Sequence, residues 1–279
     1  MGNIDFLIGD IKAKKELSNL ENDFIMQKLK PFLDRNRKIR EKLESSDYAK
    51  FRRSREHDMI IKEIRAQLRS VYGVFILDDY KKRHGLLGKL KDTPTLADHD
   101  AILSLHKSSK ERLEIYESAY PAIFDITGKP KKIVDLACGL NPISYPYLGC
   151  RPEYVACDLS EKDLEFIDEY FRLMKIKGKT QRVDLLRDDV SAITKGADVT
   201  FLFKALDSLE SVKRHSSDAL LKSIGSRWIV ASFATRSIGG RKEIRKEKRF
   251  WLDRMIERNA WTSQEIELPG EIFYVIKKA

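Results

Sequence analysis

Short runs rich in β-branched and aromatic residues alternate with helical stretches along the second half of the chain. We predict strands at residues 132–136, 154–157, 181–184, 198–203, 228–233, 264–267 and 272–276. Because strands that alternate with helices usually pair in parallel, this pattern predicts an α/β domain with a mainly parallel sheet. Only residues 268–271 separate the last two strands. This connection is too short for a crossover helix, so these two strands should pair antiparallel.

The first third of the chain shows helical spacing of its apolar residues and no strand pattern. The spacing is clearest over residues 60–72, where it buries one face of a helix and leaves the other face cationic. Pro31 is expected to break or start a helix, and Gly73 and Gly85 are expected to mark turns. A further helix is predicted at residues 96–124. The pattern thus predicts a small helical domain ahead of the sheet.

The chain has 279 residues, of which 42% are hydrophobic and 34% charged, enough for two domains with buried cores. The pattern changes after residues 91–94, which divides the chain into a helical domain at 1–94 and an α/β domain at 95–279. No apolar run approaches the roughly 20 residues that a membrane helix needs. The N-terminus also lacks the apolar core of a signal peptide. We therefore expect a soluble, cytoplasmic protein without a membrane partner.

The basic residues are concentrated in one region. The chain carries 53 Lys and Arg against 43 Asp and Glu, a net charge of +10, and residues 28–91 contain 19 basic against 9 acidic residues. Such a local excess favours phosphate contacts with RNA, although a solvated helix face is the alternative for any one cluster. The candidate RNA contacts in this region are Arg52, Arg53, Arg55, Arg69, Lys81, Lys82 and Arg83.

The three cysteines, Cys138, Cys150 and Cys157, have no CxxC pair and no neighbouring histidine. Their spacing matches neither a zinc site nor a disulfide framework. We expect reduced side chains packed in a core, and we predict no metal site.

Polar residues at the ends of the first three predicted strands form a candidate cofactor site. Gly139 lies in the turn after the first strand, Asp158 follows the second strand, and Asp184 ends the third. A glycine turn lets the backbone approach a ligand, and an acid at the end of the second strand can accept hydrogen bonds from both ribose hydroxyls. Asp184 can accept from an adenine amino group, although a helix N-cap is the alternative.

The complete G-x-G-x-x-G pattern is absent, which disfavours a dinucleotide with its pyrophosphate. A nucleoside cofactor without phosphates fits the site better, and S-adenosylmethionine is such a cofactor. The further candidate cofactor contacts are Ala137, Leu159 and Leu185, which lie near these polar residues in the sequence, and Phe203, which ends the fourth predicted strand.

Five stretches of the chain resemble, in order and spacing, the aminoglycoside-resistance 16S rRNA guanine-N7 methyltransferases of the FmrO type. These stretches are residues 106–113, 135–142, 203–210, 232–241 and 271–276. The resemblance begins at about residue 65, and the first fifty residues match poorly. It implies a Rossmann-like S-adenosylmethionine methyltransferase fold with seven strands, the last one antiparallel. It also implies methylation of a guanine N7 in the decoding region of the small ribosomal subunit, which blocks aminoglycoside binding.

The resemblance further implies roles for individual residues. Arg112 would hold the cofactor carboxylate, which its fork of donors matches; an ion pair with Glu111 or Glu114 is the alternative. Lys204 and Glu210 would line the base pocket as catalytic residues. Glu210 would orient the guanine edge, and Lys204 would hold O6 or a phosphate. The alternative is a solvent-facing pair that caps the helix after the fourth strand.

The segment after the fifth predicted strand carries further charges. Arg236 is a candidate contact for RNA or substrate, and Gly239-Gly240 would allow the loop to move. Residues 242–249 mix Lys, Arg and Glu at helical spacing, so we assign these charges to a solvent-facing helix.

The lone pair of guanine N7 carries no proton, so positioning should matter more than a general base. The chain lacks the Asp/Asn-Pro-Pro-Tyr motif of exocyclic-amine methyltransferases, which disfavours that class. Cytosine-C5 enzymes need a cysteine nucleophile after the fourth or fifth strand, but all three cysteines precede the third strand, so this class is disfavoured too. The remaining alternatives are methylation of tRNA, of another rRNA position or of a small molecule, and a non-catalytic RNA-binding ribosome-assembly factor. A monomer is expected, because a ribosomal substrate needs one exposed face.

Overall fold

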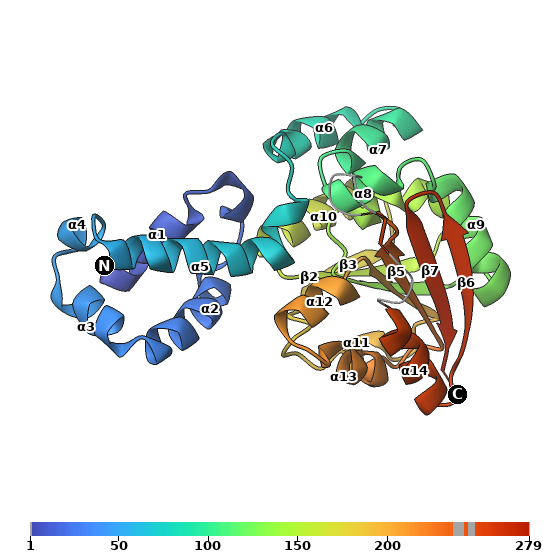
Figure 1. Cartoon of the computed structure of the whole chain (residues 1–279). Helices are drawn as coiled ribbons and strands as arrows, with labels where there is room; N and C mark the ends of the chain where they lie inside the picture. Colours follow the sequence, from blue (N-terminus) through green and yellow to red (C-terminus); the bar gives the residue numbers. More distant parts are fainter. Residues whose placement is uncertain (1, 237–242, 245–248, 279) are drawn as a thin grey trace.

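The computed structural model describes residues 2–236, 243–244 and 249–278. Figure 1 shows a group of N-terminal helices, in blue, beside a sheet that is covered by helices. None of the helices in the described residues is long and apolar enough to cross a membrane.

Five helices build the N-terminal part. They are α1 (Asn3–Lys12), α2 (Asn22–Arg35), α3 (Arg37–Ser45), α4 (Tyr48–Phe51) and α5 (Arg55–Val71), with a 3-10 turn η1 at Lys15–Leu17. α5 begins where the Ser54 hydroxyl accepts a hydrogen bond from the backbone N–H of His57, and it buries Ile60, Ile64 and Leu68 along one face. The predicted amphipathic helix over this region is confirmed.

Pro31 lies inside α2, so the expectation that it would break or start a helix is wrong. A proline removes one backbone hydrogen bond from a helix. In α2 this loss is offset by burial of the apolar face, which includes Phe24, Leu29 and Phe32.

A series of short helices connects the two parts of the molecule. It comprises η2 (Gly73–Phe75), η3 (Tyr80–Lys82), α6 (Arg83–Lys89), α7 (Leu96–Leu103), α8 (Lys107–Arg112) and α9 (Tyr116–Thr127). Gly73 lies at the predicted turn. Gly85 lies inside α6, so the turn predicted there is wrong; a Cβ atom at this position would meet nothing within 4 Å. The single helix predicted at 96–124 is wrong. The apolar spacing continues across two breaks, at residues 104–106 and 113–115, and Arg112 is buried at the end of the short helix between them.

In the part of the chain that the structure describes, seven strands form one sheet. They are β1 (Lys132–Leu136), β2 (Glu153–Asp158), β3 (Gly178–Arg182), β4 (Val199–Phe203), β5 (Trp228–Ala234), β6 (Thr262–Leu268) and β7 (Glu271–Lys277). Their order is 3-2-1-4-5-7-6, and β7 runs antiparallel to both β5 and β6. This confirms the predicted α/β fold with an antiparallel last strand. β3 ends earlier than predicted, because this edge strand is mostly polar and gives little apolar signal.

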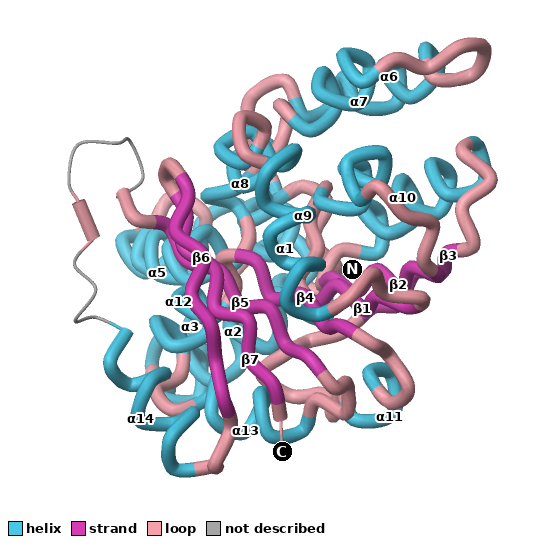
Figure 2. The backbone as a smooth tube through the Cα atoms, turned by 90° about the vertical axis from the view of Figure 1, so that its right-hand side faces the viewer, coloured by secondary structure: helices cyan, strands magenta, loops and turns pink. Residues whose placement is uncertain are grey.

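Helices cover both faces of the sheet, as Figure 2 shows. The remaining elements are η4 (Asn141–Leu148), α10 (Glu161–Leu173), α11 (Ser191–Thr194), α12 (Leu206–Val212), α13 (Ser216–Ser223) and α14 (Phe250–Arg258). Successive residues of β1 face opposite sides, so Ile133 packs with α9 and α10 while Val134 packs with α13 and α14.

The hydrophobic cores divide the chain earlier than the predicted boundary at residue 94. The N-terminal helices share their own core, which extends to Tyr72. Tyr80, Leu87 and Leu90 belong instead to the core that covers one face of the sheet. The helices between residues 80 and 94 are therefore packed as part of the sheet domain.

A buried cluster of polar side chains joins the two parts around Asp163, in the first turn of α10. The Asp163 carboxylate accepts hydrogen bonds from the Tyr72 hydroxyl and from the Asn19 amide at 3.1 Å. Its Oδ1 also lies 3.1 Å from Nη2 of Arg83, whose guanidinium stacks 4.4 Å from the ring centre of Tyr80. Arg83 is only 5% exposed. The prediction that Arg83 contacts RNA is therefore wrong, because its buried guanidinium pairs with the buried carboxylate of Asp163.

We expect the substitution R83M to lower the free energy of unfolding by about 3 kcal/mol, because it leaves a buried carboxylate without its cation. Urea denaturation measures this change. The adjacent exposed Lys82 supplies the control, since K82M should change stability by no more than about 0.5 kcal/mol. An R83M variant as stable as the wild type would contradict the structural role of Arg83.

Candidate functional site

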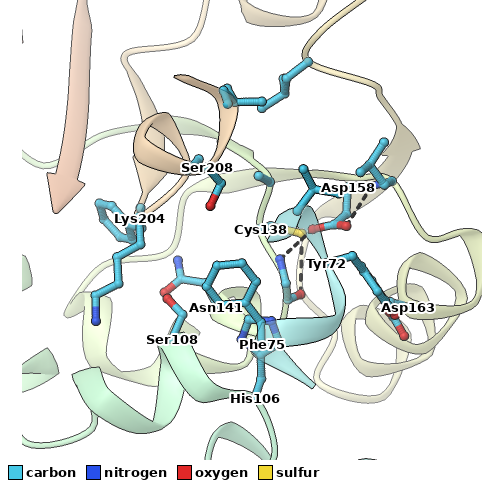
Figure 3. Close-up of a pocket in the computed structure, with 18 of the residues that line it drawn as sticks. Tyr72, Phe75, His106, Ser108, Cys138, Asn141, Asp158, Asp163, Lys204 and Ser208 are labelled. Atoms are coloured by element: carbon cyan, nitrogen blue, oxygen red, sulfur yellow. Dashed lines mark hydrogen bonds between the residues drawn. The ribbon is translucent and has the colours of Figure 1, made fainter. Parts of the chain in front are cut away.

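A cavity of about 960 Å³, including its open mouth, lies at the carboxyl ends of β1, β2 and β4 (Figure 3). Ligands bind at this edge of parallel sheets because loops and helix N-termini converge there. The N-terminal part also contributes to the wall, through Phe24, Val71 and Tyr72, and the turn η2 that follows it adds Phe75. The cavity is thus formed by both parts of the chain.

The turn after β1 forms one side of the cavity. Ala137 and Gly139 have positive φ angles of 56° and 50°, a left-handed conformation that costs a non-glycine residue roughly 1 kcal/mol or more. A Cβ atom on Gly139 would lie 2.8 Å from the His106 ring, so the close packing of this turn requires glycine. Burial lowers the pKa of His106 to about 3, so its imidazole is neutral.

Asp158 ends β2 and points into the cavity. Its Oδ2 accepts the backbone N–H of Gly139 at 2.8 Å, and its Oδ1 accepts that of Leu159 at 2.7 Å. Burial raises the pKa of Asp158 to about 6, although these N–H donors favour the ionised form. A carboxylate oxygen accepts more than one hydrogen bond, so this group still has acceptor capacity for a ligand hydroxyl.

Asp184 lies just beyond β3 and lines the cavity together with Leu185. Its Oδ1 accepts the backbone N–H of Leu186 at 3.0 Å, so the side chain also stabilises the local turn. Asp184 thus lines the cavity and caps a turn. The alternative of a helix N-cap is wrong, because the next helix begins only at Ser191, and contact with an adenine amino group stays a prediction.

Arg112 is 1% exposed and lines the cavity from the end of α8. Its Nε and Nη2 donate to Oε1 of Glu271 at 3.0 and 2.9 Å, and its Nη1 donates to Oδ1 of Asn141 at 3.1 Å. The guanidinium also lies 4.7 Å from the ring centre of Phe203. The partner of Arg112 is therefore Glu271 and not Glu111 or Glu114.

Lys204 follows β4 and lines the same cavity. Its backbone has a positive φ of 55°. Its Nζ lies 2.8 Å from Oε2 of Glu111 and 3.1 Å from Oε2 of Glu271. The side chains of Arg112 and Lys204 therefore share one buried carboxylate.

The structure does not bring Glu210 to this cavity. Its Oε2 accepts the backbone N–H of His215 at 2.9 Å, and its Oε1 accepts that of Ser217 at 2.8 Å. Partial burial opposes ionisation, but these N–H donors lower the pKa of Glu210 overall. In this arrangement Glu210 caps the start of α13, so its predicted place in the base pocket beside Lys204 is corrected.

The predicted cofactor contacts all line the cavity, together with Lys204. They are Arg112, Ala137, Gly139, Asp158, Leu159, Asp184, Leu185 and Phe203. Their contact with a cofactor stays a prediction. Sequence reasoning missed the wall from the N-terminal helices and the buried Glu271. An acidic residue at the start of an otherwise apolar strand was the available signal for Glu271.

Most of the predicted RNA contacts are exposed. These are Arg52, Arg53, Arg55, Arg69, Lys81, Lys82 and Arg236. Arg52 pairs with Asp10 at 2.9 Å and Lys82 with Asp79 at 3.0 Å, so part of this charge is already compensated.

The loop after β5 is described only in part. Gly239-Gly240 and most of residues 242–249 lie outside the described residues. Arg249 is described and is 2% exposed, with its Nη2 donating to the backbone oxygen of Ala234. Its assignment to solvent is therefore wrong, because this charge satisfies a carbonyl at the end of β5.

The three cysteines are free, and Cys138 and Cys157 are buried. Among the described residues, no group of three or more His, Cys, Asp or Glu side chains is arranged to hold a metal ion.

The sequence of this chain is similar to that of a known protein family. The family described as ribosomal RNA methyltransferase (FmrO) matches residues 49–275. The 16S rRNA (guanine(1405)-N(7))-methyltransferase of Micromonospora echinospora is 31% identical over 229 residues, which cover 78% of this chain and 82% of the relative. The enzyme of the same name from Frankia casuarinae is 28% identical over 228 residues, 78% of this chain and 80% of the relative.

Solved structures share the fold over nearly the whole chain. The 16S rRNA methyltransferase RmtF, crystallised with S-adenosyl-L-homocysteine, superposes with a TM-score of 0.80 at 23% identity and covers 99% of this chain and 98% of RmtF. The 16S rRNA methylase RmtB superposes with a TM-score of 0.72 at 22% identity over 100% of both chains. Since the family match extends over most of the sequence, the chain belongs to the FmrO family of ribosomal RNA methyltransferases.

Proposed function

We propose that this protein transfers a methyl group from S-adenosylmethionine to N7 of guanine 1405 in 16S rRNA, the activity named for its relatives. The observation that carries the proposal is the cavity, which gathers acceptors for a nucleoside, an arginine for a carboxylate and Lys204 at one edge of the sheet. Such methylation would protect the ribosome from aminoglycosides that bind the decoding region.

The residues present fit S-adenosylmethionine. Asp158 has acceptor capacity for ribose hydroxyls, and Asp184 would accept from the adenine amino group. Leu159 and Leu185 supply apolar walls for the adenine ring. Arg112 lines the cavity and would hold the cofactor carboxylate, which would take the place of one of its neutral partners, Ser108, Tyr116 or Asn141. When bound, the cofactor supplies an electrophilic methyl group.

Guanine N7 presents an unprotonated lone pair, so the protein's task is to orient the base and exclude water. Lys204 lies at the end of β4, next to Ser208 and Leu209 in the cavity wall. Its ammonium would hold guanine O6 or a phosphate, and Glu111 and Glu271 keep it in place. Because Glu210 does not line the cavity, we assign the contact with the target guanine to Lys204.

The exposed arginines of the N-terminal helices would dock the enzyme on rRNA. Arg53 and Arg55 are exposed at the start of α5. Phosphate contacts of this kind position a protein on folded RNA without reading its sequence. One copy of the chain carries both the cavity and these cations, so we propose that a monomer docks on the cytoplasmic small subunit.

Methyl transfer from labelled S-adenosylmethionine to small subunits, naked rRNA and tRNA tests the function directly. We expect label in the 16S rRNA of small subunits, recovered as N7-methylguanosine and mapped by primer extension to guanine 1405. Label in tRNA or in a small molecule would overturn the target, and no transfer to any RNA would leave a binding protein.

The substitution D158N tests the cofactor site. A hydrogen bond to a charged group contributes about 1.5–3 kcal/mol, so we expect the affinity for S-adenosylhomocysteine to fall about tenfold or more in calorimetry. Because the pKa of Asp158 is about 6 and its ionised form is the acceptor, wild-type affinity should fall as the pH drops below 6. D158N should lose this pH dependence, while the exposed control D189N should keep it. Equal affinity of D158N and wild type would contradict the assignment.

The double substitution R53E/R55E tests the docking surface. Each lost phosphate contact should reduce the slope of log affinity against log salt by about 1. We therefore expect weaker binding to small subunits and unchanged affinity for S-adenosylhomocysteine. Lys195 is exposed at the opposite end of the strands, shortly before β4, so K195E is the control, with one charge reversed where the double variant reverses two. An equal loss per reversed charge in both variants would show only a non-specific effect of charge.

A further inference from the structure

A carboxylate is buried at the start of the last strand. Glu271 is the first residue of β7 and is 1% exposed, while the residues that follow it, 272–276, are apolar or aromatic and buried. Because β7 is antiparallel, its amino end lies at the edge where β1, β4 and β5 end. The topology therefore delivers this carboxylate to the cavity edge, although Glu271 does not itself line the cavity.

The two oxygens of Glu271 serve different partners. Oε1 accepts Nε and Nη2 of Arg112 at 3.0 and 2.9 Å and the Ser232 hydroxyl at 2.5 Å. Oε2 lies 3.1 Å from Nζ of Lys204. One side chain thus fixes a cation from α8 and a cation from the loop after β4.

Removal of this carboxylate would leave two cations close together in a buried site. Burial opposes the ionisation of Glu271, but Arg112 and Lys204 outweigh it and lower its pKa, so the group is a carboxylate. Glu111, with a side chain 42% exposed, would remain as a partner for Lys204 alone. Among the residues that the structure describes, Arg112 would keep only neutral partners, namely Ser108, Tyr116 and Asn141.

We propose that Glu271 is a positioning residue for methyl transfer, which sets Arg112 for the cofactor carboxylate through one oxygen and Lys204 for the target guanine through the other. This inference rests on the proposed function, because it takes S-adenosylmethionine as the cofactor. It differs from a purely structural role in one respect. A purely structural residue would support the whole cavity. Glu271 would instead affect only the cofactor carboxylate, through Arg112, and the target guanine, through Lys204.

The substitution E271Q keeps the size of the side chain and removes its charge. Calorimetry with two ligands separates the two roles: S-adenosylhomocysteine carries the carboxylate that Arg112 would bind, and 5′-methylthioadenosine lacks it. We expect E271Q to weaken S-adenosylhomocysteine by about tenfold, since a charge-assisted contact is misaligned, and methylthioadenosine by no more than about twofold. Equal losses for both ligands, or no loss, would overturn the inference.

The Lys204 arm is tested by single-turnover methylation of small subunits at saturating labelled S-adenosylmethionine. We expect the rate constant of E271Q to fall about tenfold even when the cofactor is saturating, because Lys204 is no longer held. A normal rate constant under these conditions would overturn this half of the proposal.

Thr200 supplies a matched control for the loss of a buried polar contact. Its hydroxyl donates to Ser226 at 2.8 Å, and it is fully buried in β4 at a distance from the cavity lining. T200V should therefore leave both the ligand ratio and the rate constant unchanged.

If E271Q does not fold, S232A removes one donor from Glu271 and keeps the charge; it should shift the ligand ratio in the same direction by about threefold. An unchanged ratio in S232A would then overturn the inference. Wild-type protein that binds neither ligand would instead overturn the cofactor assignment on which the inference rests.

Discussion

The ion pair between Arg112 and Glu271 joins the helices ahead of the sheet to its last strand. Burying a carboxylate and a guanidinium is costly, and the cost is met only when both groups keep their charge and their hydrogen bonds. Here α8 must end where Arg112 enters the core, and β7 must begin at Glu271. The ion pair thus fixes the end of α8 against the start of β7.

A second buried cluster, around Asp163, fixes the N-terminal helices against the sheet. Tyr72 contributes both to this cluster and to the wall of the cavity. Phe24 and Phe75 extend the wall from the same side. The part of the chain that would dock on RNA is therefore also part of the proposed cofactor site, so movement of these helices would change the shape of that site.

Residues that follow strands could be predicted from the sequence, because parallel strands bring their carboxyl ends together. Asp158, Asp184 and Gly139 reach the cavity for this reason. The ion-pair partners of Glu271 and Arg83 could not be predicted, because they are distant in the chain; Arg112 and Glu271 are 159 positions apart. A basic residue next to others, such as Arg83, has the same local pattern whether it faces water or a buried acid. Glu210 was misplaced because a short helix turns its carboxylate towards backbone N–H groups.

The formal charges at the cavity edge bear on the proposed reaction. Arg112 and Lys204 contribute two positive charges, and Glu111 and Glu271 contribute two negative charges. Methylation at N7 leaves the guanine ring positively charged, so an uncompensated Lys204 would oppose the reaction as that charge develops. With its ammonium 2.8 Å from one carboxylate and 3.1 Å from another, Lys204 can donate a hydrogen bond to the base while its charge is balanced. In the proposed reaction, the acidic partners would thus allow Lys204 to orient a base that becomes a cation.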